Sequence, residues 1–73
     1  EMGGDGGVAF NASNEEAIRA FIAGKISFLS IFDVVEDTLS HWSAEPVVSY
    51  DSVLSSDRKA RALADAFISR KCL

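Results

Sequence analysis

The sequence predicts an all-α fold, a small bundle of three main helices with one additional short helical turn. Apolar residues recur at helical spacing in three separate segments, and two Ser-x-x-acid sequences resemble helix starts. No segment shows the clear two-residue alternation of a half-buried strand. The 73 residues, 48% of them hydrophobic, are enough for one small domain and too few for two.

Residues 1–9 are predicted to be the end of a glycine-rich linker, and residues 10–73 the helical domain. Four glycines around Asp5 leave little side chain to pack, so this start is interpreted as part of something longer. A phosphate-binding loop is disfavoured, because no Gly-Lys-Ser/Thr follows and Ala9 stands where a dinucleotide fingerprint needs its third glycine.

The first helix is expected over residues 14–23. Ser13 and Glu16 have the spacing of a capping box, in which each side chain satisfies a free backbone amide at the helix start. Gly24 follows where a left-handed residue ends a helix, and residues 25–29 then form a turn. The predicted apolar face consists of Ala17, Ile18, Phe21 and Ile22.

The second helix is expected to begin after a cap at Ser30, with Asp33 three residues on, and to end near Ser43. Its apolar stripe is the clearest periodicity in the chain and comprises Ile31, Val34, Val35, Thr38, Leu39 and Trp42. Pro46 is incompatible with a helix through residues 44–48, so an extended connection is expected there.

The last segment is predicted to hold a short helical turn over residues 51–54 and then a helix capped by Ser55 or Ser56. Asp57, Arg61 and Asp65 follow at four-residue intervals and should pair along that helix. Its apolar face is Ala60, Leu63, Ala64, Phe67 and Ile68. The stripes predict one shared core that contains Phe21, Leu39, Trp42 and Phe67.

Composition excludes several classes of function. The net charge of −4 disfavours sequence-independent nucleic-acid binding, and apolar stretches fall short of the ~18 residues that a membrane span needs. Cys72 has no partner for an internal disulfide, which suits a reducing compartment, and we expect it to be inert.

No complete catalytic constellation is visible. His41 lacks an oriented partner, so a core Trp42 beside a partly exposed His41 is favoured over a general base. The acidic residues Asp33, Glu36 and Asp37 lack the alternating ligands of a calcium loop and are interpreted as a solvated helix face. The residues themselves thus indicate a helical domain of a larger protein, with no catalytic, cofactor-binding or metal-binding residue.

Three ordered stretches go further. Residues 10–17, Phe-Asn-Ala-Ser-Asn-Glu-Glu-Ala, continue through residues 20–28, Ala-Phe-Ile-Ala-Gly-Lys-Ile-Ser-Phe. Ile31 and residues 34–39, Val-Val-Glu-Asp-Thr-Leu, come next, and then residues 51–54 with Asp57, Ala60, Arg61 and Ala64. Over nearly the whole chain this order resembles the carboxyl-terminal helical domain of 1-deoxy-D-xylulose 5-phosphate reductoisomerase. The family signature Asn-Ala-Ala-Asn-Glu stands here at residues 11–15 with Ser13 in place of the second alanine.

The resemblance implies a parent enzyme that converts 1-deoxy-D-xylulose 5-phosphate to 2-C-methyl-D-erythritol 4-phosphate, by rearrangement and NADPH-dependent reduction, in isoprenoid biosynthesis. It implies NADPH and Mg or Mn in the parent, with their binding residues upstream and none on this chain. The implied partner is the upstream catalytic domain of the same chain, with a homodimer of the parent allowed and no nucleic acid or membrane. The implied location is the cytoplasm of a bacterium or a plastid-type organelle.

Five residues are candidates for support between this piece and the catalytic domain: Asn11, Asn14, Glu15, Phe28 and Phe32. For the two asparagines, capping and linker docking are favoured over contact with substrate. Phe28, Phe32 and Val47 are further expected to form an apolar patch for a missing partner surface, because so short a chain cannot bury all of its apolar residues. The alternative function is an independent helical interaction module with no enzymatic parent.

Overall fold

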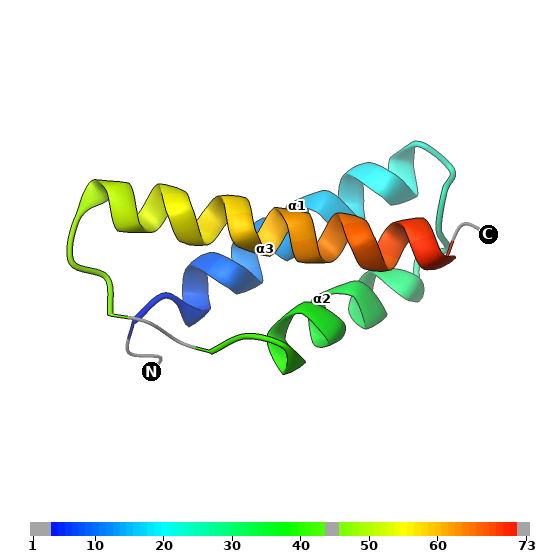
Figure 1. Cartoon of the computed structure of the whole chain (residues 1–73). Coiled ribbons are helices and arrows are strands. Elements are labelled where there is room, and N and C mark those ends of the chain that lie inside the picture. Colours follow the sequence, from blue (N-terminus) through cyan, green and yellow to red (C-terminus); the bar gives the residue numbers. More distant parts are fainter. Residues whose placement is uncertain (1–3, 44–45, 72–73) are drawn as a thin grey trace.

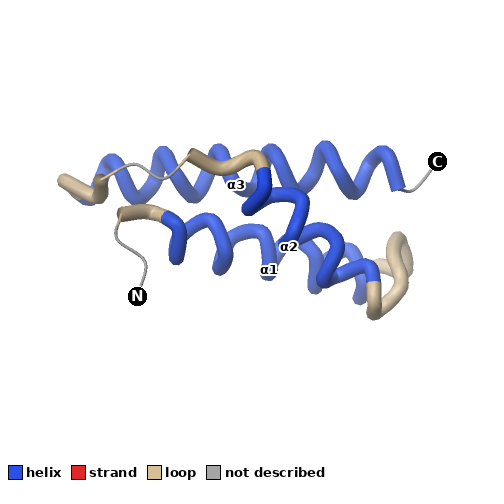
Figure 2. The backbone as a smooth tube through the Cα atoms, turned by 90° about the horizontal axis from the view of Figure 1, so that it is seen from below, coloured by secondary structure: helices blue, strands red, loops and turns tan. Residues whose placement is uncertain are grey.

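Three helices make up the fold of the computed structural model, which describes residues 4–43 and 46–71. They are α1 (Gly6–Ile22), α2 (Ser30–Ser40) and α3 (Tyr50–Lys71), with no strand in the described ranges. Helix α1 contacts both others, α2 runs opposite to α1, and α3 crosses α1 in roughly the same direction (Figure 1). Seen from below, α2 lies across the other two helices (Figure 2). The predicted all-α fold is confirmed.

Helix α1 begins eight residues earlier than the capping box predicts. Ser13 is buried in the middle of the helix, and its hydroxyl donates to the Ala9 carbonyl (2.8 Å) instead of capping a terminus. The reason is tertiary burial, because Ala9 and Ala12 pack against Ala60 of α3. Gly6 and Gly7, expected in the linker, therefore lie in the first turn of α1.

The end of α1 agrees with the prediction. Gly24 has a φ of +80°, which glycine adopts without strain. Its amide donates to the Phe21 carbonyl (3.0 Å), and the Lys25 amide donates to the Ala20 carbonyl (2.9 Å). These two bonds form the Schellman arrangement that satisfies the last carbonyls of a helix.

Helix α2 starts at Ser30, one residue earlier than a cap at Ser30 predicts, and ends at Ser40, before the predicted end near Ser43. The predicted Ser30 cap is wrong, since Leu29 is the N-cap residue. The Ser30 amide donates to the hydroxyl of Ser27 (3.3 Å), one turn earlier. Among the described residues that follow, positions 46–48 are non-helical, as Pro46 requires.

Helix α3 is one continuous element, and the predicted break between a short turn and a later helix is wrong. Ser49 caps it instead, because the Ser52 amide donates to the Ser49 hydroxyl and the Ser49 amide to the Ser52 hydroxyl, each at 3.1 Å. Ser55 and Ser56, expected as caps, lie inside the helix. Although α3 has 22 residues, neither it nor any other helix among the described residues is both long and apolar enough to cross a membrane.

The chain enters the bundle through a buried carboxylate. Asp5 is 1% exposed and accepts hydrogen bonds from the Trp42 indole nitrogen (2.9 Å) and from the Ser56 hydroxyl (2.5 Å). Burial of a carboxylate is costly unless it is hydrogen-bonded, and these donors meet that need. Asp5 thus attaches the start of α1 to α3 and to the segment after α2.

The core consists of two clusters instead of the one shared core that the stripes predict. One joins Ala17, Ala20, Ile31, Val34, Ala64 and Ile68, with Phe67 packed against it. The other joins Ala9, Ala12 and Ala60, with Leu39 and Trp42 packed against it. Helix α1 buries an alanine face, so its large residues Ile18, Phe21 and Ile22 are exposed, contrary to expectation. Small side chains let the helix axes approach closely, which a pattern of hydrophobicity alone does not reveal.

Candidate inter-domain surface

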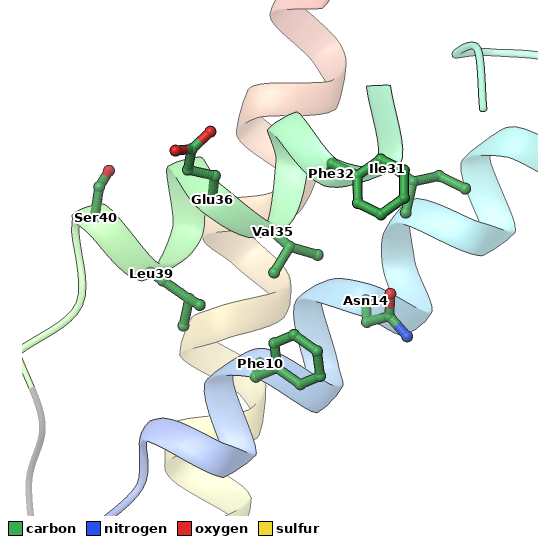
Figure 3. Close-up of a pocket in the computed structure, with 8 residues that line it drawn as sticks. All are labelled: Phe10, Asn14, Ile31, Phe32, Val35, Glu36, Leu39 and Ser40. Atoms are coloured by element: carbon green, nitrogen blue, oxygen red, sulfur yellow. The ribbon is translucent and has the colours of Figure 1, made fainter. Parts of the chain in front are cut away.

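An open groove of about 710 Å³ separates α1 from α2 on one side of the bundle. From α1 it is lined by Phe10 and Asn14, and from α2 by Ile31, Phe32, Val35, Glu36, Leu39 and Ser40. These eight residues define the α1–α2 groove. Val35 and Leu39 point toward Phe10, whereas Glu36 and Ser40 lie on the opposite edge of α2 (Figure 3).

Large apolar side chains are exposed in and beside this groove. Phe10 is 49% exposed and Phe32 60% exposed. Phe28, 58% exposed, packs edge-on against both Phe32 and Phe21 with ring centres 5.8 and 5.9 Å apart. Exposed apolar residues that adjoin one another are typical of surfaces that contact a partner. The predicted exposure of Phe28 and Phe32 is confirmed; Val47 is also exposed, but it lies before α3 and does not line the groove.

The five candidate support residues divide into two groups. Asn14 and Phe32 line the α1–α2 groove, and Phe28 is adjacent through its ring contact with Phe32. Asn11 is exposed on α1 outside the groove, and Glu15 faces α3. The predicted capping role of Asn11 and Asn14 is wrong, because both residues lie inside α1. Contact of any of the five with another domain stays a prediction.

Glu15 belongs to a charged cluster that joins α1 to α3 around Arg61. The guanidinium donates to Asp57 (2.8 Å), Glu16 (2.7 Å) and Glu15 (2.7 Å). The predicted Asp57–Arg61 pair along α3 is confirmed. Hydrogen bonds to Asp57, Glu15 and Glu16 raise the pKa of Arg61 above its ordinary value despite partial burial. Arg61 is therefore a fixed cation that ties two helices together.

Asp65 pairs with Glu16 of α1 instead of with Arg61 as predicted. Burial would raise the pKa of Glu16, but hydrogen bonds with Arg61 and Asp65 and the charges of Arg19 and Arg61 together lower it. Burial, the hydrogen bond with Glu16 and the negative charge of Glu16 raise the pKa of Asp65. The two carboxyl groups are thus pushed in opposite directions, with Asp65 the one that holds a proton more readily.

Helix α2 presents acids to the basic end of α3. Arg70 lies 3.8 Å from Asp37, and Lys71 lies 3.7 Å from Asp33. His41 is exposed, with Nδ1 2.9 Å from the Asp37 carbonyl, while Trp42 is half-buried, as expected of the pair. The acidic face of α2 is therefore partly neutralised within the bundle, and Glu36 borders the groove from the edge of α2 that points away from Phe10 (Figure 3).

The described residues contain no cluster of metal-ligating side chains. Within residues 4–43 and 46–71, no three His, Cys, Asp or Glu side chains gather where they could hold a metal. The glycines that could have approached a phosphate lie partly in α1, and Cys72 lies outside the described residues. No reaction step is assigned to these side chains.

The groove also contains residues that the sequence did not suggest as inter-domain contacts, among them Phe10, Val35 and Leu39. Phe10 and Asn14 are four apart and share one face of α1, a signal that the late predicted start of the helix conceals. Val35 and Leu39 are also four apart but belong to a stripe that hydrophobicity assigns to the core. The shared face of Phe10 and Asn14 becomes visible only once α1 is known to start at Gly6.

Comparison with known proteins places the chain in a family. A family model described as the DXP reductoisomerase C-terminal domain matches residues 1–63. The chain is 44% identical over 72 residues to 1-deoxy-D-xylulose 5-phosphate reductoisomerase of Treponema denticola, which covers 93% of the chain and 19% of that protein. The same enzyme of Pseudomonas savastanoi is 39% identical over 70 residues, 96% of the chain and 18% of that protein.

A third relative, the reductoisomerase of Ralstonia pickettii, is 41% identical over 70 residues, again 96% of the chain and 18% of that protein. The chain thus spans less than a fifth of the length of these curated relatives. The helical structure and the family match agree, and the match disfavours an independent module without an enzymatic parent. The chain belongs to the family of DXP reductoisomerase C-terminal domains.

Proposed function

We propose that this chain is the non-catalytic helical part of an NADPH-dependent 1-deoxy-D-xylulose 5-phosphate reductoisomerase and that it braces the catalytic domain of the same polypeptide. NADPH, a divalent metal ion and the substrate would bind to the remainder of that polypeptide. The location would be a bacterial cytoplasm or a plastid-type organelle, and two parent chains could pair.

The observation that carries this proposal is the exposed apolar surface on a chain with no catalytic cluster among its described residues. Phe10, Phe28 and Phe32 are each about half exposed or more, although the chain buries two alanine-rich clusters beside them. Water contact with such a surface is unfavourable by roughly 25 cal/mol per Å² of apolar area. The chain spans less than a fifth of the length of its relatives, which supports a partner for that surface in the rest of the same polypeptide.

The proposal is tested on the complete polypeptide and on a version that stops just before residue 1. We expect substrate-dependent NADPH oxidation from the complete polypeptide, and a loss of activity with a lower melting temperature from the shortened one. NADPH binding by the shortened version, measured by fluorescence titration below its melting temperature, should persist. The 73-residue chain alone should neither oxidise nor bind NADPH.

Unchanged kcat and melting temperature after removal of these residues would contradict the bracing role. NADPH turnover by the 73-residue chain alone would contradict its non-catalytic character. The matched control is the complete polypeptide with Val48→Asp, because Val48 is 80% exposed and lies outside the α1–α2 groove.

A further inference from the structure

We propose that the α1–α2 groove binds a segment from the N-terminal remainder of the same polypeptide. That segment presents apolar side chains to the phenylalanines, a free peptide group to Asn14 and a basic side chain to Glu36. The inference rests on the proposed function and specifies the surface through which bracing occurs.

The walls of the groove favour an apolar occupant. Phe10 and Phe32 stand on its two sides, and the buried Ile31 forms part of its base. Two half-exposed aromatic rings on facing helices offer a large contact area at a small cost in side-chain entropy. Such anchors, surrounded by a few polar groups, are typical of the centre of protein interfaces.

Asn14 adds a polar contact with a defined shape. Its carboxamide is half-buried between apolar side chains, and within the described ranges it forms no hydrogen bond. A carboxamide carries one acceptor and two donors, which match the N–H and C=O of a single peptide group. A backbone segment that has no partner of its own, such as an extended chain, satisfies both.

Glu36 indicates that the bound segment carries a positive charge. Helix α2 contains three acids and no base, and α3 pairs with Asp33 and Asp37 through Lys71 and Arg70. Across the part of the chain that the structure describes, Glu36 has no ion pair. A lysine or arginine on the incoming segment would complement it and fix the register of docking.

The polypeptide itself supplies the occupant at the right place. Asp5 is hydrogen-bonded to Trp42, two residues beyond the end of α2, so the chain enters beside the Leu39 and Ser40 end of the groove. The N-terminal remainder, more than four-fifths of the length of the relatives, is joined to this entry point. Attachment gives an effective concentration in the millimolar range for short linkers, an advantage that a second copy lacks.

The test measures access to the groove in the complete polypeptide. Ser40→Cys places a thiol at the border of the groove, and Ser55→Cys places one on exposed α3 outside it; both changes are nearly isosteric. Maleimide labelling is followed by peptide mass mapping, and each rate is divided by the rate in urea. We expect the normalised rate at Ser40→Cys to be at least tenfold lower than at Ser55→Cys, independent of protein concentration.

Two further variants show whether the groove side chains cause this protection. Phe32→Asp should restore fast labelling of Ser40→Cys, and the fold should tolerate it because Phe32 is largely exposed and a carboxylate suits the first turn of a helix. Val48→Asp should not restore it. Asn14→Leu should raise the rate several-fold, while Asn11→Leu, one turn away and outside the groove, should leave it unchanged.

A benzophenone attached through Ser40→Cys should crosslink to a peptide that precedes residue 1 and contains Lys or Arg. Fast labelling of Ser40→Cys in the folded polypeptide, protection that grows with protein concentration, or crosslinks to a second copy would overturn the inference. An open groove in a polypeptide that still needs these residues for activity overturns only the docking site. A covered groove in a polypeptide that remains fully active and stable without residues 1–73 overturns only the proposed function.

Discussion

Arg61 stabilises the bundle through three carboxylates at once. Its guanidinium is planar and always charged, so it can hold Asp57 on its own helix and Glu15 and Glu16 on α1. Glu16 is buried and would be left without its strongest donor if Arg61 were lost. The arrangement exceeds an ordinary surface ion pair, which contributes about 0 to 1 kcal/mol.

Arg61→Ala should therefore lower the free energy of unfolding by about 1 to 3 kcal/mol, the range for removing one partner of a hydrogen-bonded charged group. Urea unfolding followed by circular dichroism measures it. Arg58→Ala is the matched control, because Arg58 is exposed on the same helix and should change stability by less than about 0.5 kcal/mol. Equal losses in both variants would show that the Arg61 cluster contributes nothing specific.

Asp65 gives the stability a pH dependence of known sign. Its pKa in the folded chain is raised above 3.8 by burial and then by Glu16, so the folded state favours protonated Asp65. Its contribution is complete below the pKa of the unfolded chain and is lost as the pH rises through the raised pKa. The lowered pKa of Glu16 acts oppositely, with a contribution present above its unfolded pKa and lost as the pH falls.

Asp65→Asn should stabilise the chain relative to the parent at pH 7. The Asn amide can donate a hydrogen bond to Glu16 at any pH, whereas Asp65 can donate one only when it is protonated. The difference should shrink as the pH falls through the raised pKa of Asp65, because Asp65 itself is protonated below it. Urea unfolding at a series of pH values measures this difference. A difference that stays constant with pH would contradict the assigned direction of the Asp65 pKa.

At the scale of single elements, the start of α3 is determined by the pair Ser49 and Ser52. Each hydroxyl accepts from the other residue's amide, which satisfies two donors that the helix cannot. Ser49→Ala should cost about 1 kcal/mol of unfolding free energy, the usual value for a lost cap, while Ser55→Ala inside the helix should be neutral or slightly stabilising. If the Ser55 variant were the destabilised one, the helix would begin where the sequence pattern places it.

The helices illustrate what sequence can and cannot reveal. Gly24 marks the end of α1 because its positive φ is a local requirement that needs no other part of the chain. Ser13 and Ser56 have the local appearance of caps, yet both are buried inside helices because distant residues pack around them. Local signals are ambiguous for these serines, and tertiary contacts decide.

The candidate surface shows the same division. Phe28 and Phe32 lie outside every predicted core stripe, and the surplus of apolar residues suffices to predict that they are exposed. Phe10 and Asn14 could not be placed beside them, because their position depends on a helix start that only burial of Ala9 and Ala12 establishes.

At the scale of the whole molecule, the exposed apolar surface should cause the separate 73-residue chain to self-associate. We expect concentration-dependent association in sedimentation and binding of an apolar dye such as ANS. Phe32→Asp should reduce both several-fold, because it places a charge between Phe28 and the groove. Val48→Asp, equally charged and remote from the groove, is the control; an equal reduction by both would attribute association to net charge alone.

Trp42 is the single tryptophan of the chain, and its indole is hydrogen-bonded to Asp5 with the Lys59 ammonium 5.0 Å from the ring centre. Its fluorescence therefore reports whether Asp5, at the start of α1, is in place against Trp42. Asp5→Asn should shift its emission while the helical circular dichroism changes little. In a complete polypeptide whose other tryptophans are replaced by phenylalanine, this signal would let a stopped-flow experiment time the attachment of the N-terminal segment separately from the formation of the helices.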